Sequence, residues 1–264
     1  MPDDFFVGEF EHVKLKRDEH VLEVTLNRPE SYNALHSAAH FELDGVFTAF
    51  EADQDLWIAI ITGAGEKAFC SGNDLKVTAS GGDMSTPPSG FAGLCSRSNR
   101  EKPVIAAVNG VAMGGGLEIV LACDVALASS NATFALPEVK VGLFAAAGGV
   151  QRLTRQIGKK AAMELILTGR KIDAVEAAKL GLVNSVAGTN VLTAARELAQ
   201  VIAANSPTSI RASKRVLNAV DNLGNWDEAL ALSQAEIVKL MQTKDCREGV
   251  TAFAQKRKPN WVNG

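Results

Sequence analysis

Residues 108 to 124 read Val108-Asn-Gly-Val-Ala-Met-Gly114-Gly115-Gly116-Leu-Glu118-Ile-Val-Leu-Ala-Cys-Asp124. We interpret this stretch as the end of a buried strand, a turn of three glycines, and a helix whose first turn carries Glu118. Consecutive glycines cost chain entropy, so the turn suggests that another group approaches the backbone closely. The free N–H groups at the start of such a helix favour negative charge. A carboxylate beside this turn is typical of acid–base chemistry. The same residues also fit a tight turn with a solvent-exposed glutamate.

The composition is that of a globular protein with a sizeable core. Of 264 residues, 47% are hydrophobic and 22% are charged, and the net charge is −3. Because like charges form no long block, we expect no nucleic-acid binding. The apolar run near residues 105–128 contains Asn109, Glu118 and Asp124, so we expect no membrane span.

The cysteines, histidines and N-terminus indicate a reducing, cytoplasmic setting. The four cysteines form no C-x-x-C pair, which predicts free thiols. All four histidines fall within the first 40 residues and form no H-E-x-x-H motif, so we expect no metal site. The acidic N-terminus resembles neither a signal peptide nor an Arg-rich transit peptide.

Hydrophobic patterning predicts an α/β core to about residue 205 and an all-helical region over residues 206–264. In the core we expect a hairpin formed by residues 13–16 and 21–27, a helix over 37–50 capped by Ser37, and a short helix over 174–180. We also expect buried or extended strands over 57–62, 104–108, 125–128 and 133–136. Further helices are predicted over 191–204, 207–220, 226–241 and 245–255. Leu230, Ile237 and Leu240 fall on one helical stripe, which indicates core or interface.

Two other stretches have competing interpretations. Gly63-Ala-Gly65-Glu-Lys-Ala68 matches a dinucleotide-binding pattern, but no amphipathic helix follows it, which argues against that function. Residues 77–90 are polar, small and proline-containing, so they form a loop that is either a mobile lid or an uninvolved surface segment.

An ordered set of motifs resembles the crotonase family, also called the enoyl-CoA hydratase/isomerase superfamily. The set includes Leu26-Asn-Arg-Pro-Glu30 with Asn33-Ala-Leu35, Ala68-Phe-Cys-Ser-Gly-Asn-Asp-Leu75, Gly110-Val-Ala-Met-Gly-Gly-Gly-Leu-Glu118, Cys123-Asp124, Pro137-Glu138, Gly148-Gly149-Val-Gln-Arg-Leu153, Leu167-Thr-Gly169, Ala177-x-x-Leu-Gly-Leu-Val183 and Glu248-Gly-x-x-Ala-Phe-x-x-Lys-Arg-Lys-Pro259. The resemblance runs through nearly the whole chain. It implies an α/β spiral of ββα units, a C-terminal helical trimerisation region, and a homotrimer or homohexamer.

The resemblance also implies a site for acyl-CoA thioesters, with no cofactor beyond the CoA of the substrate. The backbone N–H groups of Ser71 and Gly115 would form an oxyanion hole for the thioester oxygen. CoA would contact several further positions, which are Ser71, Gly72, Asn73, Asp74, Gly115, Phe253 and Lys256. The last two would act at the nucleotide end of CoA, where a neighbouring subunit could supply them.

Both catalytic acids of the family's hydratases have counterparts here. The resemblance assigns Glu118 to the deprotonation of water and Glu138 to proton donation at the α-carbon, with reversed or shared roles as alternatives. Isomerases commonly keep only the second acid, so the pair favours an enoyl-CoA hydratase. The alternatives are a dehydratase of a carnitinyl-type 3-hydroxyacyl-CoA, an isomerase, and a non-enzymatic CoA- or RNA-binding protein. Ala145 stands where many relatives have proline, which leaves the acyl group open.

Overall fold

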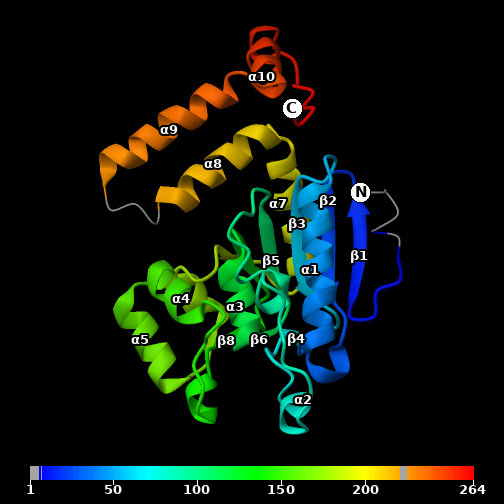
Figure 1. The fold of residues 1–264 in the computed structure, drawn as a ribbon, viewed down its shortest axis with the longest axis vertical. Helices are drawn as coiled ribbons and strands as arrows, with labels where there is room; N and C mark the ends of the chain where they lie inside the picture. The colour runs from blue at the N-terminus through cyan, green and yellow to red at the C-terminus, as the bar shows by residue number, and fades with distance from the viewer. Residues whose placement is uncertain (1–5, 7, 221–224) are drawn as a thin grey trace.

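The structure of the protein is a computed structural model that describes residues 6, 8–220 and 225–264. Figure 1 shows sheets and helices packed in layers, with the C-terminal helices stacked at one end. The larger sheet contains, in order, β1 (Val13–Asp18), β2 (Val21–Leu26), β3 (Ile58–Gly63), β5 (Val104–Val108), β7 (Val125–Ala128) and β10 (Ser185–Val186). The smaller sheet contains β4 (Ala68–Cys70), β6 (Val111–Met113), β8 (Thr133–Ala135) and β9 (Ile172–Asp173).

Strand pairing confirms the predicted α/β spiral. β1 and β2 form the expected antiparallel hairpin, and from β2 to β10 the large sheet is parallel. Three times in succession a strand of the large sheet leads into a strand of the small sheet and then into a helix. The three units are β3–β4–α2, β5–β6–α3 and β7–β8–η4, with α2 at Leu75–Ala79, α3 at Gly115–Ala122 and the 3₁₀ helix η4 at Glu138–Val141. Parallel pairing of β4, β6 and β8 brings the ends of these units together.

The remaining helices surround this spiral and extend beyond it. They are α1 (Ser37–Ala52), α4 (Gly149–Ile157), α5 (Lys159–Thr168), α6 (Ala174–Leu180), α7 (Val191–Ala203), α8 (Pro207–Val220), α9 (Trp226–Leu240) and α10 (Lys244–Ala254), with 3₁₀ turns η2 (Pro29–Ser31) and η3 (Phe91–Gly93). The predicted helices are present to within a few residues. The predicted cap of α1 is wrong, because the side chain of His36 accepts the Ala39 N–H and Ser37 is already helical.

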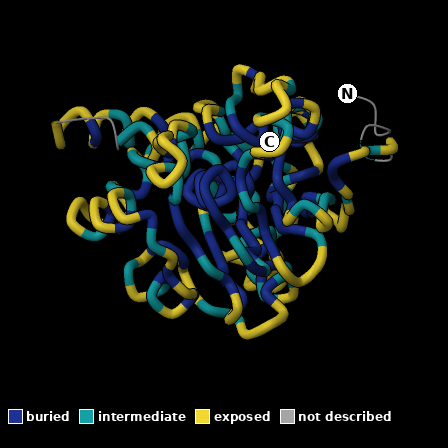
Figure 2. The backbone as a smooth tube through the Cα atoms, turned by 90° about the horizontal axis from the view of Figure 1, so that it is seen from below, coloured by how far each residue is buried: buried dark blue, intermediate teal, exposed yellow. Residues whose placement is uncertain are grey.

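The core lies on both faces of the large sheet, and Figure 2 shows buried backbone, in dark blue, through the middle of the molecule. One face packs against α1 and α3 in the main apolar cluster. The other face, including Ile58, Ile60 and Ile105, packs against Val191, Ala195 and Ala199 of α7. All six residues of β3 are buried, as expected for a parallel strand covered on both sides. No helix in the described part of the chain is long and apolar enough to span a membrane.

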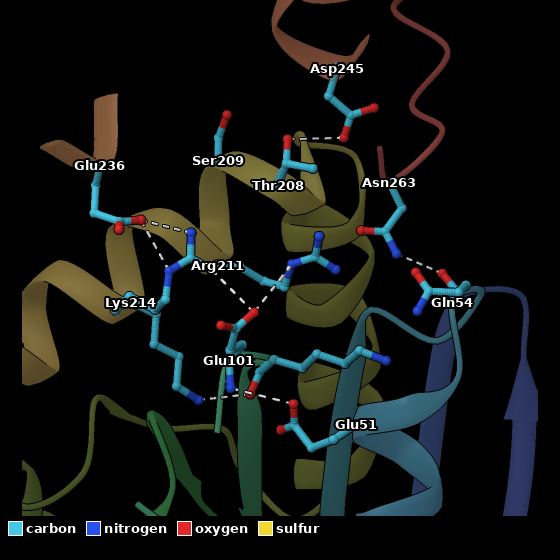
Figure 3. A network of polar contacts seen from close by, with 12 residues as sticks. Glu51, Gln54, Glu101, Thr208, Ser209, Arg211, Lys214, Glu236, Asp245 and Asn263 are labelled. Carbon is cyan, nitrogen blue, oxygen red and sulfur yellow. Dashed lines mark hydrogen bonds and ion pairs between the residues drawn. The ribbon is translucent and has the colours of Figure 1, made fainter. Parts of the chain in front are cut away.

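A polar network attaches α8, α9 and α10 to the core (Figure 3). Arg215 of α8 pairs with Glu101 at 3.1 Å and with Glu236 of α9 at 2.8 Å. Lys214 reaches Asp124, the residue before β7, at 2.7 Å. The network thus joins the C-terminal helices to the spiral. The predicted division of the chain into two regions near residue 205 stays a prediction.

Asp245 of α10 is the most deeply buried acid of this junction, with 0% of its surface exposed. It accepts hydrogen bonds from the Thr208 hydroxyl at 3.1 Å, the Ser206 hydroxyl at 3.4 Å and the Val262 N–H at 2.9 Å. Asp245→Ala leaves these donors without their acceptor, so we expect a loss of about 2–4 kcal/mol in the free energy of unfolding. Urea denaturation measures it, with the exposed Asp227→Ala as control. Equal losses in the two variants would contradict the assignment.

Candidate active site

The triple-glycine turn connects β6 to α3 and is held tightly by its neighbours. Gly114 has a φ of 54°, and its N–H donates to the Ala135 carbonyl at 2.9 Å. A Cβ atom at Gly116 would lie 1.9 Å from the Cys70 carbonyl oxygen, and one at Gly115 would lie 2.4 Å from Cζ of Phe91. Only glycine fits these positions, because the protein's own backbone and a phenyl ring occupy the space. Gly115 is the first residue of α3, so its N–H has no acceptor within the helix.

The turn at residues 70–74 lies directly against the glycine turn. Gly72 has a φ of 95°, and a Cβ atom on it would lie 3.0 Å from the Gly115 nitrogen. The structure therefore brings Ser71, Gly72 and Gly115 together. However, the Ser71 N–H donates to the Tyr32 carbonyl at 3.0 Å. The expected second oxyanion donor thus already has a hydrogen-bond acceptor within the chain.

Asn73 and Asp74 have structural partners in this turn. Asp74 is buried, accepts from Arg28 at 3.0 Å and caps α2 through the Lys76 N–H at 3.2 Å. Burial of this carboxyl opposes its ionisation, but the hydrogen bonds from Arg28 and the α2 amides prevail and lower its pKa. The Asn73 amide points to Met84, in the segment 77–90 predicted as a loop. That segment begins inside α2, and its role as a mobile lid stays a prediction.

Glu118 lies in the first turn of α3 and points into the protein, with only 4% of its surface exposed. Its Oε1 accepts the Gly149 N–H at 2.9 Å from the start of α4. Burial raises the pKa of Glu118 to about 7, the Gly149 hydrogen bond opposes the rise, and the charge of Glu138 adds to it. The solvent-exposed alternative for Glu118 is therefore wrong. Its carboxyl can exchange protons near neutral pH.

Glu138 follows β8 and opens η4, where it is half-buried. A Cβ atom at Gly114 would lie 3.0 Å from Glu138 Oε1, so this carboxyl lies over the glycine turn. Its Oε2 is buried and accepts no hydrogen bond from any residue that the structure describes. Burial raises its pKa. Glu138 thus lies over the glycine turn, Glu118 lies in the helix that this turn opens, and the charge of Glu138 raises the pKa of Glu118.

The two expected C-terminal contacts to CoA lie elsewhere. Phe253 of α10 is 87% exposed, and Lys256 follows the same helix. Figure 1 places α10 at the opposite end of the molecule from α2. The contact of Phe253 and Lys256 with CoA, from this chain or from a neighbouring subunit, stays a prediction.

Two side chains at the site were not assigned from the sequence. Phe91 packs its ring against Gly115 and contacts the His40 ring, with a centroid distance of 4.4 Å. No motif marks it, since it follows an irregular polar segment. Arg152 lies within the quoted motif 148–153 but carried no expected role, although it contacts the turn that binds Glu118. Among the residues that the structure describes, no cluster of three or more His, Cys, Asp or Glu is arranged to hold a metal ion.

This chain is similar in sequence to a known protein family over nearly its whole length. The profile described as Enoyl-CoA hydratase/isomerase matches residues 16–264. A carnitinyl-CoA dehydratase of Escherichia coli K12 is 42% identical over 258 residues, covering 95% of this chain and 98% of the relative. The corresponding Proteus mirabilis protein is 41% identical over 248 residues, covering 91% and 94%.

Solved structures agree with the sequence relatives. An enoyl-CoA hydratase of Mycobacterium marinum superposes with a TM-score of 0.91 at 37% identity, covering 96% of this chain and 99% of the other. A carnitinyl-CoA hydratase of Mycobacterium avium gives 0.77 at 39% identity, with coverage of 96% and 99%. The profile match and these identities, together with the glycine turn and its two acids, show that the chain belongs to the enoyl-CoA hydratase/isomerase family.

Proposed function

We propose that this protein catalyses the reversible addition of water to the double bond of a 2-enoyl-CoA, giving a 3-hydroxyacyl-CoA. The observation that carries the proposal is the placement of Glu118 and Glu138. Both are shielded acids with raised pKa values. Glu138 lies over the glycine turn, whose first helical N–H can bind an oxyanion, and Glu118 lies in the first turn of the helix that this turn opens. The relatives named hydratase and dehydratase support the same hydro-lyase chemistry, since one site serves both directions.

In the hydration direction, Glu118 removes a proton from water as the water oxygen bonds to the β-carbon. The electrons of the double bond move toward the thioester, and negative charge develops on its oxygen. Glu138 then gives a proton to the α-carbon, so the substrate gains one hydroxyl and one hydrogen. Dehydration reverses each step, with the two carboxyls exchanging protonation states.

The developing oxyanion is assigned to the Gly115 N–H together with the Ser71 N–H. For the Ser71 N–H to act as the second oxyanion donor, the thioester oxygen must accept its hydrogen bond either together with the Tyr32 carbonyl or in place of it. One oxyanion donor is typically worth about 3–4 kcal/mol of activation free energy. Glycine is needed at positions 72, 115 and 116 because a Cβ atom there would lie within 3 Å of Met113, Phe91 or Cys70, respectively.

The function is tested with purified protein and a panel of acyl-CoAs, by loss of the conjugated-thioester absorbance and detection of 3-hydroxy product. The panel holds straight 2-enoyl-CoAs, a branched one, and one with a terminal trimethylammonium group. Reaction of that last substrate alone would favour the carnitinyl-type dehydratase, the second candidate, which relatives at 41–42% identity support. Double-bond migration without 3-hydroxy product would indicate an isomerase. If no acyl-CoA of the panel reacts, the proposed enzymatic activity is contradicted.

Phe91 is expected to restrict the length of the acyl group. Its ring is 8% exposed and lies against Gly115, beside the proposed thioester site. Phe91→Ala should raise the kcat/KM ratio of an eight-carbon to a four-carbon enoyl-CoA about tenfold, because the enlarged space can bury about two further methylenes at about 0.8 kcal/mol each. Phe41→Ala, which removes an exposed ring of α1, is the control. An unchanged ratio for Phe91→Ala would exclude this residue as the limit.

We further propose that the enzyme acts as a homotrimer or a pair of trimers. A groove of about 500 Å³ between α8 and α9 is lined by apolar side chains, including Leu230 and Ile237. Trp226 and Met241, at the two ends of α9, are 72% and 64% exposed in the single chain. Apolar surface of this kind favours burial against another subunit. Analytical ultracentrifugation measures the assembly, and a stable monomer at micromolar concentration would contradict it.

A further inference from the structure

We propose that Arg152 is a positioning residue for Glu118, which it holds in place and keeps ready to ionise through the turn at residues 147–149. The inference rests on the proposed function for its catalytic consequence. Its structural basis is independent of that function, since it consists of contacts within this chain.

The first step is the contact between Arg152 and the turn. Its Nη1 donates to the Ala147 carbonyl at 3.2 Å, and its Nη2 donates to the Cys95 carbonyl at 2.6 Å. A Cβ atom at Gly148 would lie 2.1 Å from Nη1, so the guanidinium lies directly against that glycine. Gly148 has a φ of 98°, in the left-handed region that glycine accommodates without strain. One planar side chain thereby joins the turn before α4 to the segment that follows η3.

The second step is the contact between this turn and Glu118. The Gly149 N–H donates to Glu118 Oε1 at 2.9 Å, and a Cβ atom at Gly149 would lie 2.9 Å from the same oxygen. The backbone N–H of Ala147 also favours the ionised form of Glu118 and lowers its pKa. Arg152 therefore fixes the segment that supplies backbone donors to the catalytic carboxyl. A shift of this turn would weaken both donors at once.

The third step is charge. Arg152 has no carboxylate partner among the described residues, and Cys95 and Ala147 supply only carbonyl oxygens. The groups facing Glu118 are Glu138 from η4, Arg152 from α4 and the buried thiol of Cys95. Arg100 donates to the Ala122 carbonyl. Glu138 opposes the ionisation of Glu118 and Arg152 favours it, so Arg152 offsets part of the repulsion between the two acids.

The test compares Arg152→Gln with Arg152→Lys and with Arg155→Gln, a control that removes an exposed arginine from the same helix. Arg152→Gln is expected to lower kcat about 10- to 100-fold with KM changed less than about threefold. In the pH profile of its hydration rate, the acidic limb, where the rate falls as Glu118 becomes protonated, should move to higher pH. Arg152→Lys should keep the limb near its wild-type position with an intermediate kcat, because charge is kept and the two-pronged contact is lost.

A second measurement does not depend on activity. A ¹³C NMR titration of labelled glutamate carboxyls, with the Glu118 signal assigned by Glu118→Gln, follows this group in each folded variant. The Glu118 midpoint should rise in Arg152→Gln and stay unchanged in Arg155→Gln. Equal midpoints in wild type and Arg152→Gln would overturn the inference, even in an active enzyme. If wild type is inert toward all acyl-CoAs but the midpoint moves, the proposed function fails while the positioning role stands. If Arg152→Gln does not fold, the Arg152→Lys titration and kcat decide: wild-type values in both would overturn the proposal.

Discussion

Glu138→Gln should lower kcat for hydration about 10²- to 10⁴-fold, because the amide cannot give a proton to the α-carbon. The shape of the site should survive, since glutamine preserves the length of the side chain that lies over Gly114. The buried Oε2 position accepts no hydrogen bond from a described residue. The substitution should therefore leave stability unchanged or slightly increased, since it removes a carboxyl whose burial raises its pKa.

Exchange of the α-proton separates the role of Glu138 from that of its partner. In D₂O, wild type should incorporate deuterium at the α-carbon of a saturated acyl-CoA, which cannot undergo hydration. Glu138→Gln should lose this exchange along with hydration, while its dissociation constant for CoA remains within a few-fold of wild type. If the variant retains deuterium exchange but loses hydration, a residue other than Glu138 transfers the proton at the α-carbon. Lost CoA binding would indicate a damaged site instead.

The fold could be predicted from local patterns because its units are regular. The buried strands β3 and β5 are short apolar runs that end at Gly63 and before Asn109, and α8 carries strong helical periodicity. The two-residue strands β9 and β10 were not predicted, because two residues cannot show a period. They exist through pairing with β8 and β7, which are distant in sequence. Likewise, the cap from His36 depends on a side-chain geometry that residue preference alone ranks below Ser37.

Chemistry and motif order indicated the candidate residues of the site, whereas the tertiary contacts around them could not be predicted. The burial of Glu118 depends on α4, whose Gly149 lies 31 positions later. Phe91 belongs to a turn shaped by His40, which accepts the Ala92 N–H at 3.1 Å across 52 positions. The Ser71 amide was expected to be free, yet the parallel contact between residues 32–35 and 71–74 gives it an acceptor in Tyr32. None of these contacts leaves a periodic signal in the sequence.

Glu118→Gln is the second substitution for which we expect a loss of about 10²- to 10⁴-fold in hydration, because no base then remains for the attacking water. In wild type, Glu118 must be ionised to act as this base, and its pKa is about 7. The rate of hydration should therefore fall as the pH decreases through 7, and Glu118→Gln should lack this limb. A steady-state pH profile of kcat/KM from pH 5 to 9 measures both effects.

The same substitution gives a stability signature that misfolding cannot imitate. The pKa of Glu118 is raised from 4.5 to about 7 on folding, so between these values the folded state binds more protons than the unfolded state. The contribution of this group to stability therefore decreases as pH rises through that interval, and at pH 8 its ionised form opposes folding. Glu118→Gln should accordingly have a Tm at pH 8 equal to or above that of wild type. A lower Tm would attribute its lost activity to structural damage.

Glu118→Gln also discriminates hydration from isomerisation, since the two reactions use the acids differently. Isomerisation needs proton transfer at carbon and an oxyanion donor, both available from Glu138 and Gly115 without an activated water. Deuterium exchange at the α-carbon should thus persist in Glu118→Gln while 3-hydroxy product disappears. If this variant still forms 3-hydroxyacyl-CoA at the wild-type rate, water is activated elsewhere and the assignment of Glu118 is wrong. If wild type forms none and both proteins migrate the double bond equally, burial of Glu118 serves the structure and the enzyme is an isomerase.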